Sequence, residues 1–212
     1  MAISDMRRQY SMGSLTEKQL TPHPVTLFKM WLQDAIDAGV PDPTAMTVAT
    51  VAANGQPSQR IVLLKDVAEE GFVFYTNLGS RKAQEIAANP KVALHFPWFF
   101  MERQVRICGT AEKLSAAENA RYFFSRPKDS QLAAYASKQS QTISTREMLM
   151  TQFHQLKEKF ANKSLPVPDF WGGFRIKPHQ VEFWQGGEDR LHDRFEYNVD
   201  DAGDWQTQRL MP

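Results

Sequence analysis

Cysteine and long apolar runs are scarce in this chain. Its 212 residues include a single cysteine, so no intramolecular disulfide can form, in keeping with a reducing compartment. No apolar run reaches the roughly 18 residues that a membrane-spanning helix needs, and no signal-peptide pattern is present, so we expect a soluble, cytoplasmic protein. Cys108 lies in the apolar run 105–109, where we expect a small buried hydrophobic residue rather than a nucleophile.

Sequence motifs for several kinds of chemistry are also missing. There is no GxGxxG, no Walker loop, no HExxH pair, no CxxC and no nucleophile elbow. The five histidines are not spaced as metal ligands, so no metal site is predicted. With 25 basic and 24 acidic residues the formal charge is +1, which disfavours binding to nucleic acid or to an anionic membrane. An anion must therefore be bound by a local cluster of cations.

The chain divides into an arm and one domain. Residues 1–21 are polar and lack a sustained apolar period, so we expect a flexible arm or a short helix there. Residues 22–212 are expected to form a single domain. Its first element is a helix, because apolar residues recur at helical spacing over 27–36.

Strand patterns dominate the rest of the domain. Residues 45–53 and 56–64 flank Asn54-Gly55, the strongest short signal for a hairpin. Further strands are expected over 72–75, 92–96, 104–111, 174–177, 181–184, 191–197 and near Trp205. Helices are expected over 80–88, 115–124, 130–137 and 144–160, with an N-cap at Ser80 and capping boxes at Ser115 and Ser144. Since strands cluster in hairpins instead of alternating with helices, we predict a mainly β protein, an antiparallel barrel with peripheral helices.

Three ionisable side chains alternate near the C-terminus. If residues 190–194 are extended, Arg190, His192 and Arg194 lie on one face. Guanidinium groups donate forked hydrogen bonds to phosphate and stack on rings, so this face suits an anionic, planar ligand. A solvated basic face on an edge strand is an equally good interpretation of this segment alone.

Other cations stand where an anion could use them. Arg60 and Lys65 are five residues apart, so in a strand without a bulge they point to opposite faces and could serve two anions. The alternative is that both reach water from the strand ends. Arg81 and Lys82 follow the N-cap Ser80, where backbone N–H groups and cations together form a phosphate-binding site.

Several long motifs in one order resemble the pyridoxine/pyridoxamine 5′-phosphate oxidase family. The likeness runs from about Arg7 to Pro212 and rests on Arg60-Ile-Val-Leu-Leu-Lys65, Phe74-Tyr-Thr-Asn-Leu-Gly-Ser-Arg-Lys82, Phe170-Trp-Gly-Gly-Phe174, Phe183-Trp-Gln-Gly-Gly and Arg190-Leu-His-Asp-Arg194. The resemblance implies an FMN-binding split β-barrel, antiparallel and Greek-key-like. It also implies a homodimer with FMN at the interface, and a C-terminal segment, about 165–212, for dimerisation and substrate contacts.

The resemblance also assigns roles to individual residues. It implies FMN contacts from Arg60, Ile61, Val62, Leu63, Leu64, Lys65, Tyr75, Thr76, Arg81, Lys82, Gln104, Gln139, Ser140, Trp184 and Arg194. It implies substrate contacts from Arg7, Arg8, Gln9, Tyr10, Lys65, Tyr122, Arg126, Ser130, Arg190, Leu191 and His192, of which Arg190 and His192 would be catalytic. The element Arg7–Tyr10 would fold over the occupied site. Gln9 and Asp189 depart from the family pattern, and Asp189 has no assigned role.

The implied reaction belongs to vitamin B6 biosynthesis and salvage. Pyridoxine or pyridoxamine 5′-phosphate would be oxidised to pyridoxal 5′-phosphate, with O₂ as acceptor and H₂O₂ released. Our hypothesis is hydride transfer from the substrate C4′ to flavin N5, with Arg190 covering the pyridine ring. Two alternatives remain: a split-barrel flavin reductase, and a non-catalytic binder of flavin or pyridoxal phosphate. The sequence leaves the preferred substrate open.

Overall fold

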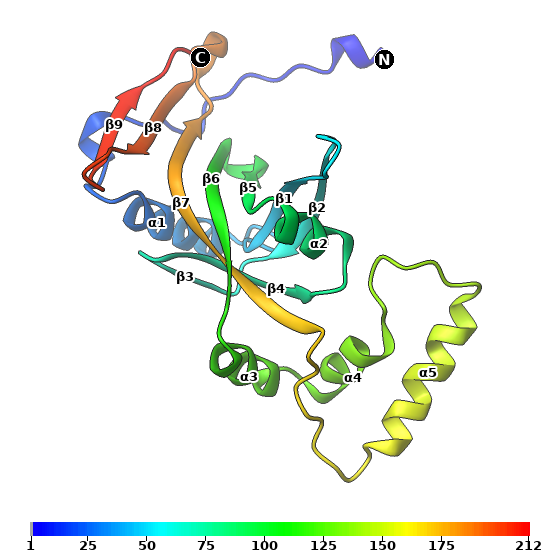
Figure 1. The fold of residues 1–212 in the computed structure, drawn as a ribbon. Helices are drawn as coiled ribbons and strands as arrows, with labels where there is room; N and C mark the ends of the chain where they lie inside the picture. Colours follow the sequence, from blue (N-terminus) through cyan, green and yellow to red (C-terminus); the bar gives the residue numbers. More distant parts are fainter. Residues whose placement is uncertain (1) are drawn as a thin grey trace.

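The computed structural model describes residues 2–212, and its centre is one antiparallel sheet (Figure 1). Its nine strands are β1 (Ala45–Val51), β2 (Pro57–Leu63), β3 (Asp66–Ala68), β4 (Gly71–Asn77), β5 (Lys91–Trp98), β6 (Arg103–Lys113), β7 (Trp171–Gln185), β8 (Asp193–Val199) and β9 (Trp205–Arg209). The strand order is β2-β1-β5-β6-β7-β4-β3, and β8 joins β7 to β9. The prediction of an antiparallel, mainly β architecture is confirmed.

Helices surround this sheet. They are α1 (Pro24–Asp37), α2 (Arg81–Ala88), α3 (Ala116–Ser125), α4 (Lys128–Ala136) and α5 (Arg146–Lys159), with short 3₁₀ turns at Ile3–Asp5, Glu17–Gln19, Phe99–Met101 and Glu188–Arg190. Helix α5 projects from the side of the molecule away from β8 and β9 (Figure 1). Within residues 2–212, the helices are all too short or too polar to cross a membrane.

Strand β7 is the longest element of the sheet. Two strands, 174–177 and 181–184, were predicted here, but the chain forms one strand from Trp171 to Gln185. The segment between the two predicted strands forms a β-bulge. Gly109 pairs with Pro178 and Cys108 with Gln180, so the pairing skips His179. Proline lacks an N–H donor and is tolerated at such a site. A side chain at position 109 would meet the Lys177 carbonyl oxygen at 2.5 Å, so glycine is needed there.

The hydrophobic core lies between the sheet and α1. Phe28 is fully buried, and its ring centre lies 4.9 Å from that of Phe72 and 4.8 Å from that of Phe96. One helical turn later, Trp31 packs edge-on against Phe183 at 5.2 Å. The apolar face of α1 therefore joins strands β4, β5 and β7, and removing a ring such as Phe28 would cost about 3–5 kcal/mol.

The second half of the N-terminal arm is fastened to the domain. Leu15 is 1% exposed and belongs to the core, although the polar composition of 1–21 gave no sign of this. Its N–H donates to an Asp193 carboxylate oxygen at 2.9 Å, and the Met12 N–H donates to Glu102 at 3.0 Å. The arm is thus anchored from Met12 onward.

Helix boundaries follow the predicted capping residues in part. Ser80 and Ser115 are N-caps, as predicted. Ser144 is not, because Thr145 caps α5 by accepting the Met148 N–H at 3.3 Å. Helix α4 begins at Lys128, so Ser130 lies inside its first turn and does not cap it. Cys108 is half-buried where full burial was predicted.

Candidate active site

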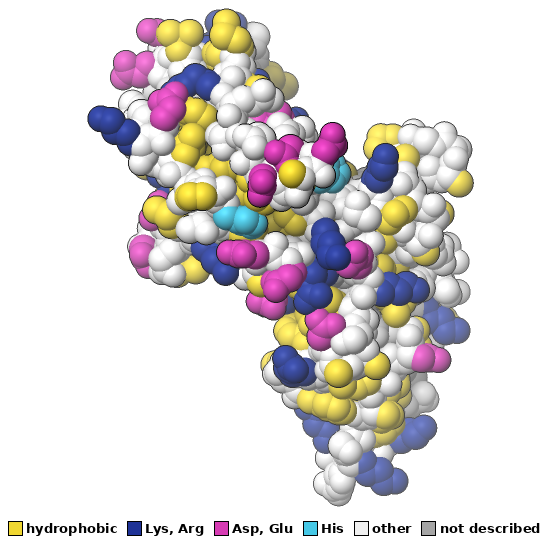
Figure 2. Space-filling model, turned by 60° about the vertical axis from the view of Figure 1, so that its left-hand side comes forward, with side chains coloured by type: hydrophobic (Ala, Val, Ile, Leu, Met, Phe, Trp, Pro, Cys, Tyr) yellow, Lys and Arg dark blue, Asp and Glu magenta, His cyan; other side chains and the backbone are white. Residues whose placement is uncertain are grey.

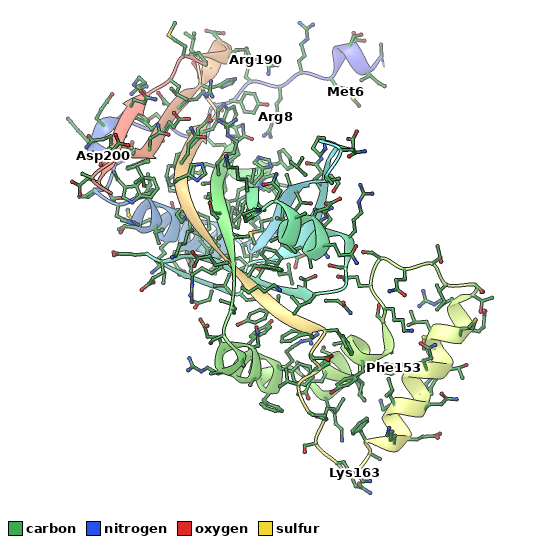
Figure 3. All side chains as sticks on the ribbon, in the orientation of Figure 1. Met6, Arg8, Phe153, Lys163, Arg190 and Asp200 are labelled. Carbon is green, nitrogen blue, oxygen red and sulfur yellow. The ribbon has the colours of Figure 1, made fainter. Side chains whose placement is uncertain are left out.

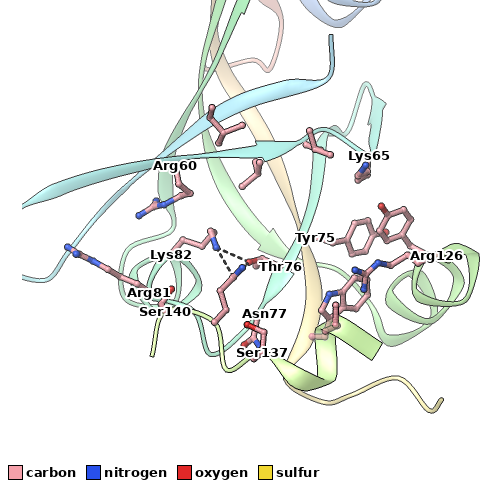
Figure 4. A pocket seen from close by; sticks show the side chains of 18 residues that line it. Arg60, Lys65, Tyr75, Thr76, Asn77, Arg81, Lys82, Arg126, Ser137 and Ser140 are labelled. Atoms are coloured by element: carbon pink, nitrogen blue, oxygen red, sulfur yellow. Dashed lines mark hydrogen bonds between the residues drawn. The ribbon is translucent and has the colours of Figure 1, made fainter. Parts of the chain in front are cut away.

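An open cavity of about 680 Å³ lies beside β2, the junction of β4 with α2, and helices α3 and α4 (Figure 4). It gathers most of the residues for which the family resemblance implies contacts with FMN, together with three of the implied substrate contacts. Those that line it are Arg60, Ile61, Val62, Leu63, Lys65, Tyr75, Thr76, Arg81, Lys82, Tyr122, Arg126, Gln139 and Ser140. Residues from four separate segments of the chain therefore meet in one cavity.

One end of this cavity is cationic. Helix α2 begins where β4 ends, and the Ser80 hydroxyl accepts the Ala83 N–H at 3.4 Å. Arg81 and Lys82 occupy the first turn, where cations oppose the helix dipole and a bound anion is favoured. Arg60, on β2, borders the same end (Figure 4). Three cations and a helix N-terminus thus lie together at one end of the cavity, an arrangement that favours an anion.

Lys82 is held in place by neutral groups. Its Nζ lies 3.0 Å from the Thr76 hydroxyl and 2.9 Å from the Gln139 side-chain oxygen (Figure 4). The Asn77 amide donates to the Ser137 carbonyl at 3.1 Å, which ties the loop after α4 to the end of β4. Burial lowers the pKa of Lys82, and the nearby charge of Arg60 lowers it further. An anion in the cavity would counter both effects.

Aromatic rings form the opposite end of the cavity. The ring centres of Tyr75 and Tyr122 lie 4.0 Å apart in a stacked arrangement, and Trp171 stacks on Tyr75 at 5.2 Å. The paired residue opposite Tyr75 is Gly173, where a Cβ atom would meet that ring at 2.8 Å. Glycine at position 173 therefore leaves room for the Tyr75 ring.

Arg126 is the cation of this aromatic end. It lies at the C-terminus of α3 with its guanidinium carbon 5.0 Å from the ring centre of Trp171. Its Nη1 is buried and has no hydrogen-bond partner among the described residues. Burial lowers the pKa of Arg126, against a smaller opposing effect of Tyr122. A buried guanidinium nitrogen without an acceptor is costly, so this geometry favours an anionic ligand.

Arg60 and Lys65 border one cavity rather than two sites on opposite faces of a strand. Strand β2 ends at Leu63, so strand alternation does not extend to Lys65. The two cations lie toward opposite ends of the cavity (Figure 4). Their separation within the cavity allows each cation to contact a different anion. The predicted cause, side chains on opposite faces of one strand, does not apply.

A second set of predicted residues lies elsewhere on the same chain. Gln104, Trp184 and Arg194 are directly paired across β6, β7 and β8, and they border a smaller cavity of about 320 Å³. Arg194 donates to Glu182 at 2.7 Å. Trp184 and Trp171 are 13 residues apart on β7, which corresponds to about 40 Å along an extended strand. Within one chain, the cross-strand row of Gln104, Trp184 and Arg194 therefore does not reach the larger cavity.

Arg190 and His192 do not share an extended face with Arg194. The chain forms a 3₁₀ turn at Glu188–Arg190 with Arg190 at φ +67°, and β8 begins only after His192. The condition for a shared face, an extended chain over 190–194, is therefore not met, and the predicted strand 191–197 begins only at Asp193. The rings of Tyr10 and His192 instead meet edge-on at 5.3 Å, and the Arg190 guanidinium lies 5.5 Å from the Tyr10 ring centre.

The N-terminal arm joins this second set. Arg8 and Arg190 lie at the end of the molecule opposite Phe153 and Lys163 (Figure 3), and Arg8 also contacts the Tyr10 ring at 5.1 Å. A side chain at Gly186 would meet Tyr10 at 2.7 Å, so the glycine makes room for that ring.

The remaining predicted residues line neither cavity. Leu64 is buried in the core, and Ser130 is half-buried in the first turn of α4. Arg7, Gln9 and Leu191 are exposed. Leu64 was predicted because it lies inside a continuous motif, but it follows the end of β2 and its side chain packs in the core.

Three residues near the cationic end were not predicted from the sequence. Glu85, on α2, pairs with Arg81 and Arg60, and the hydroxyls of Thr50 and Ser58 lie between them. The i,i+4 spacing of Arg81 and Glu85 can be seen in the sequence. The contact of Thr50 with this group cannot, because it depends on the register in which β1 pairs with β2.

Charges of both signs are interspersed over the face shown in Figure 2. No field of one sign covers this face, in agreement with the balanced composition. The cationic end of the cavity is therefore a local feature, as the sequence predicts.

Comparisons with known proteins match the whole chain. The model of the family "Pyridoxamine 5′-phosphate oxidase" matches residues 32–160, and that of the "Pyridoxine 5′-phosphate oxidase C-terminal dimerisation region" matches residues 171–212. A pyridoxine/pyridoxamine 5′-phosphate oxidase of Alteromonas mediterranea is 76% identical over 100% of both chains. The chain belongs to the pyridoxine/pyridoxamine 5′-phosphate oxidase family. The homologue of the same name in Vibrio parahaemolyticus is 60% identical, again over 100% of both chains.

Solved structures show the same oxidase-family fold. PhzG from Burkholderia lata, in complex with tetrahydrophenazine-1-carboxylic acid, has a TM-score of 0.88 and 32% identity, covering 93% of this chain and 98% of that one. An FMN-binding protein from Nostoc punctiforme, related to pyridoxamine 5′-phosphate oxidase, has a TM-score of 0.74 and 16% identity, covering 91% and 100%. The nine-stranded sheet is therefore the split barrel of this family.

His192 offers a test of the second set. Burial lowers its pKa, and the charge of Arg190 lowers it further, so the neutral ring is favoured at neutral pH. Replacing Arg190→Gln removes the second cause, and we expect the pKa of His192 to rise, as followed by NMR titration of its ring. Arg146→Gln on distant α5 is the control. A titration unchanged by Arg190→Gln would contradict this electrostatic coupling.

Proposed function

We propose that this chain binds FMN and oxidises pyridoxine 5′-phosphate or pyridoxamine 5′-phosphate to pyridoxal 5′-phosphate. The observation that carries the proposal is a single cavity with cations at both ends and stacked aromatic rings at one of them. Two phosphorylated, planar molecules have the charge and shape that such a cavity accommodates. The reaction would serve vitamin B6 biosynthesis and salvage in the cytoplasm.

The cationic end fits the FMN phosphate. Arg60, Arg81 and Lys82 would donate charge-assisted hydrogen bonds to its oxygens, and the first turn of α2 adds favourable dipoles. Thr76 and Gln139 already hold the Lys82 ammonium in position. The remaining family positions in the cavity, including Ile61 to Leu63, Tyr75 and Ser140, would line the rest of the cofactor.

Lys65, Tyr122 and Arg126 would bind the substrate phosphate. In the part of the chain that the structure describes, the buried Nη1 of Arg126 has no acceptor, and a phosphate oxygen would provide one. When bound, FMN would supply a two-electron acceptor at N5 for the hydride of the substrate C4′, with O₂ reduced to H₂O₂, and for the amine substrate water would be consumed and ammonia released. Holding the phosphate remote from C4′ fixes the orientation of the substrate. Ser130, on the first turn of α4, would contribute from the adjoining helix.

A second subunit would complete each site. Trp184, Arg190, His192 and Arg194 all fall within the family's C-terminal dimerisation region, and they lie apart from the cavity of their own chain. We propose a homodimer with FMN at the interface, in which Gln104, Trp184 and Arg194 contact the flavin bound to the partner. Arg190 and His192, with the arm residues Arg7 to Tyr10 and Leu191, would face the partner's substrate.

Other functions in the same fold fit less well. A flavin reductase or a non-catalytic flavin binder would leave Arg126 without a purpose. The PhzG structure holds a carboxylic acid without phosphate, whereas the cation set of Lys65 and Arg126 suits a phosphorylated substrate.

Anaerobic mixing with pyridoxine 5′-phosphate tests the reaction. We expect the flavin absorbance of the FMN-loaded protein to bleach and to recover when air is admitted, with pyridoxal 5′-phosphate formed. A flavin that stays oxidised would exclude this substrate and favour a reductase. A protein that takes up no FMN would exclude the proposed cofactor site.

Arg126→Gln should specifically impair substrate binding. A charge-assisted hydrogen bond to phosphate is worth about 1.5–3 kcal/mol, so KM should rise by about tenfold or more. The dissociation constant of FMN should not change, because Arg126 lies at the other end of the cavity. Steady-state kinetics and FMN titration measure both. Arg121→Gln, on the same helix but outside the cavity, is the control, and an unchanged KM in Arg126→Gln would refute the assignment.

Subunit complementation tests the shared site. Arg60→Ala and Arg194→Ala should each weaken FMN binding as homodimers. In their mixed dimer one site carries both changes and the other carries none, so random mixing should restore about a quarter of the native sites. Titration with FMN after co-expression counts them. Mixing Arg60→Ala with Arg81→Ala should restore none, and equal results in the two mixtures would argue against a site built from two chains.

A further inference from the structure

Glu85 lies behind the cationic end of the cavity and does not line it. Its side chain is 7% exposed and bonds to three neighbours. One carboxylate oxygen accepts the Arg81 Nε–H at 2.7 Å. The other accepts the Thr50 hydroxyl and, at 2.8 Å, the Ser58 hydroxyl. Thr50 and Ser58 are directly opposite each other on β1 and β2, so both hydroxyls reach the same oxygen.

The same two hydroxyls hold Arg60. Its Nη1 lies 2.6 Å from the Thr50 oxygen, and its Nη2 lies 2.6 Å from the Ser58 oxygen. A guanidinium only donates and a carboxylate only accepts, so each hydroxyl must give its single proton to Glu85 and accept from Arg60. The carboxylate therefore sets the direction of both hydrogen bonds to Arg60. The Arg60 Nη2 itself lies 3.5 Å from Glu85.

We propose that Glu85 is a positioning residue for a phosphate monoester, fixing Arg60 through two hydroxyls and Arg81 directly, without touching the ligand. The proposal rests on the proposed function, because the phosphate is that of FMN. It extends that function by giving a role to a buried carboxylate in a site that binds an anion.

The charges of this group match a phosphate dianion. Burial raises the pKa of Glu85, but hydrogen bonds from Thr50, Arg81 and Ser58 outweigh it and bring the pKa to about 2. The carboxylate is therefore ionised at neutral pH. Arg60, Arg81 and Lys82 carry three positive charges, of which Glu85 offsets one, leaving two to meet a phosphate monoester of charge near −2.

Fixing two arginines beforehand favours binding. A free arginine side chain loses rotamer freedom when it binds a ligand, whereas one already held by Glu85 does not lose it again. Against this, a carboxylate near a phosphate repels it. The two effects predict opposite results when the carboxylate is removed, so experiment can separate them.

Glu85→Gln is the first variant. Its amide oxygen can still accept from Thr50 and Ser58, but its NH₂ group would face the Arg81 Nε–H, donor against donor. Arg81 is released while Arg60 is kept, and we expect the dissociation constant of FMN to rise about tenfold. Riboflavin, which lacks the phosphate, should bind as it does to the unchanged protein. In an Arg81→Gln background, Glu85→Gln should have no further effect.

Thr50→Val is the second variant, nearly equal in shape and unchanged in charge. It removes one hydroxyl between Glu85 and Arg60, so FMN should bind several-fold more weakly and riboflavin equally well. Repulsion alone predicts no change for this variant. Glu118→Gln is the matched control, because Glu118 also pairs with an arginine but lies away from the cationic end. Binding is followed by flavin fluorescence, and melting of the unliganded protein checks each fold.

Three results overturn the proposal. Tighter FMN binding by Glu85→Gln would show that repulsion prevails. Unchanged FMN binding by both variants would show no positioning. Equal weakening of FMN and riboflavin would show a purely structural role. If the unaltered protein binds neither flavin, the proposed function fails, and the role of Glu85 fails with it.

Discussion

The backbone pairing of β7 is the constraint on which the rest of the structure depends. This strand bonds to β6 along its length, while its first half also bonds to β4 and its second half to β8. Trp171 at its start stacks in the large cavity, and Trp184 near its end belongs to the cross-strand row. A single ladder thus separates two groups of predicted site residues within one chain, and the proposed homodimer would bring such groups together.

The two ends of the cavity differ in how their cations are satisfied. At the α2 end, Arg60 and Arg81 already have hydrogen-bond partners, which hold both side chains in place. At the aromatic end, Arg126 has a buried nitrogen that lacks a hydrogen-bond partner within residues 2–212. An arginine without an acceptor gains more from an arriving anion than one whose hydrogen bonds are already made, so the aromatic end favours binding of an anion.

Local signals in the sequence predicted local structure well. The Asn54-Gly55 hairpin and the caps at Ser80 and Ser115 depend on a few neighbouring residues, and all are present. Features that depend on tertiary pairing were not predictable: the bulge opposite Gly109 that makes β7 continuous, and the meeting of Thr50 with Glu85. Motif resemblance identified most residues of the cavity, but it could not show that Trp184 and Arg194 lie apart from them.

The anchoring of the arm at Met12 and Leu15 limits its reach. Arg7 is five residues from Met12, so even a fully extended chain carries its backbone no more than about 18 Å from that anchor. The backbone of Tyr10, two residues from Met12, can move less than half as far from the anchor. The arm is therefore short, and its reach is measured from the point where Met12 is bonded to Glu102. Inserting residues between Tyr10 and Met12 would let residues 7–10 reach farther from the anchor, whereas insertions before Arg7 would not change that distance.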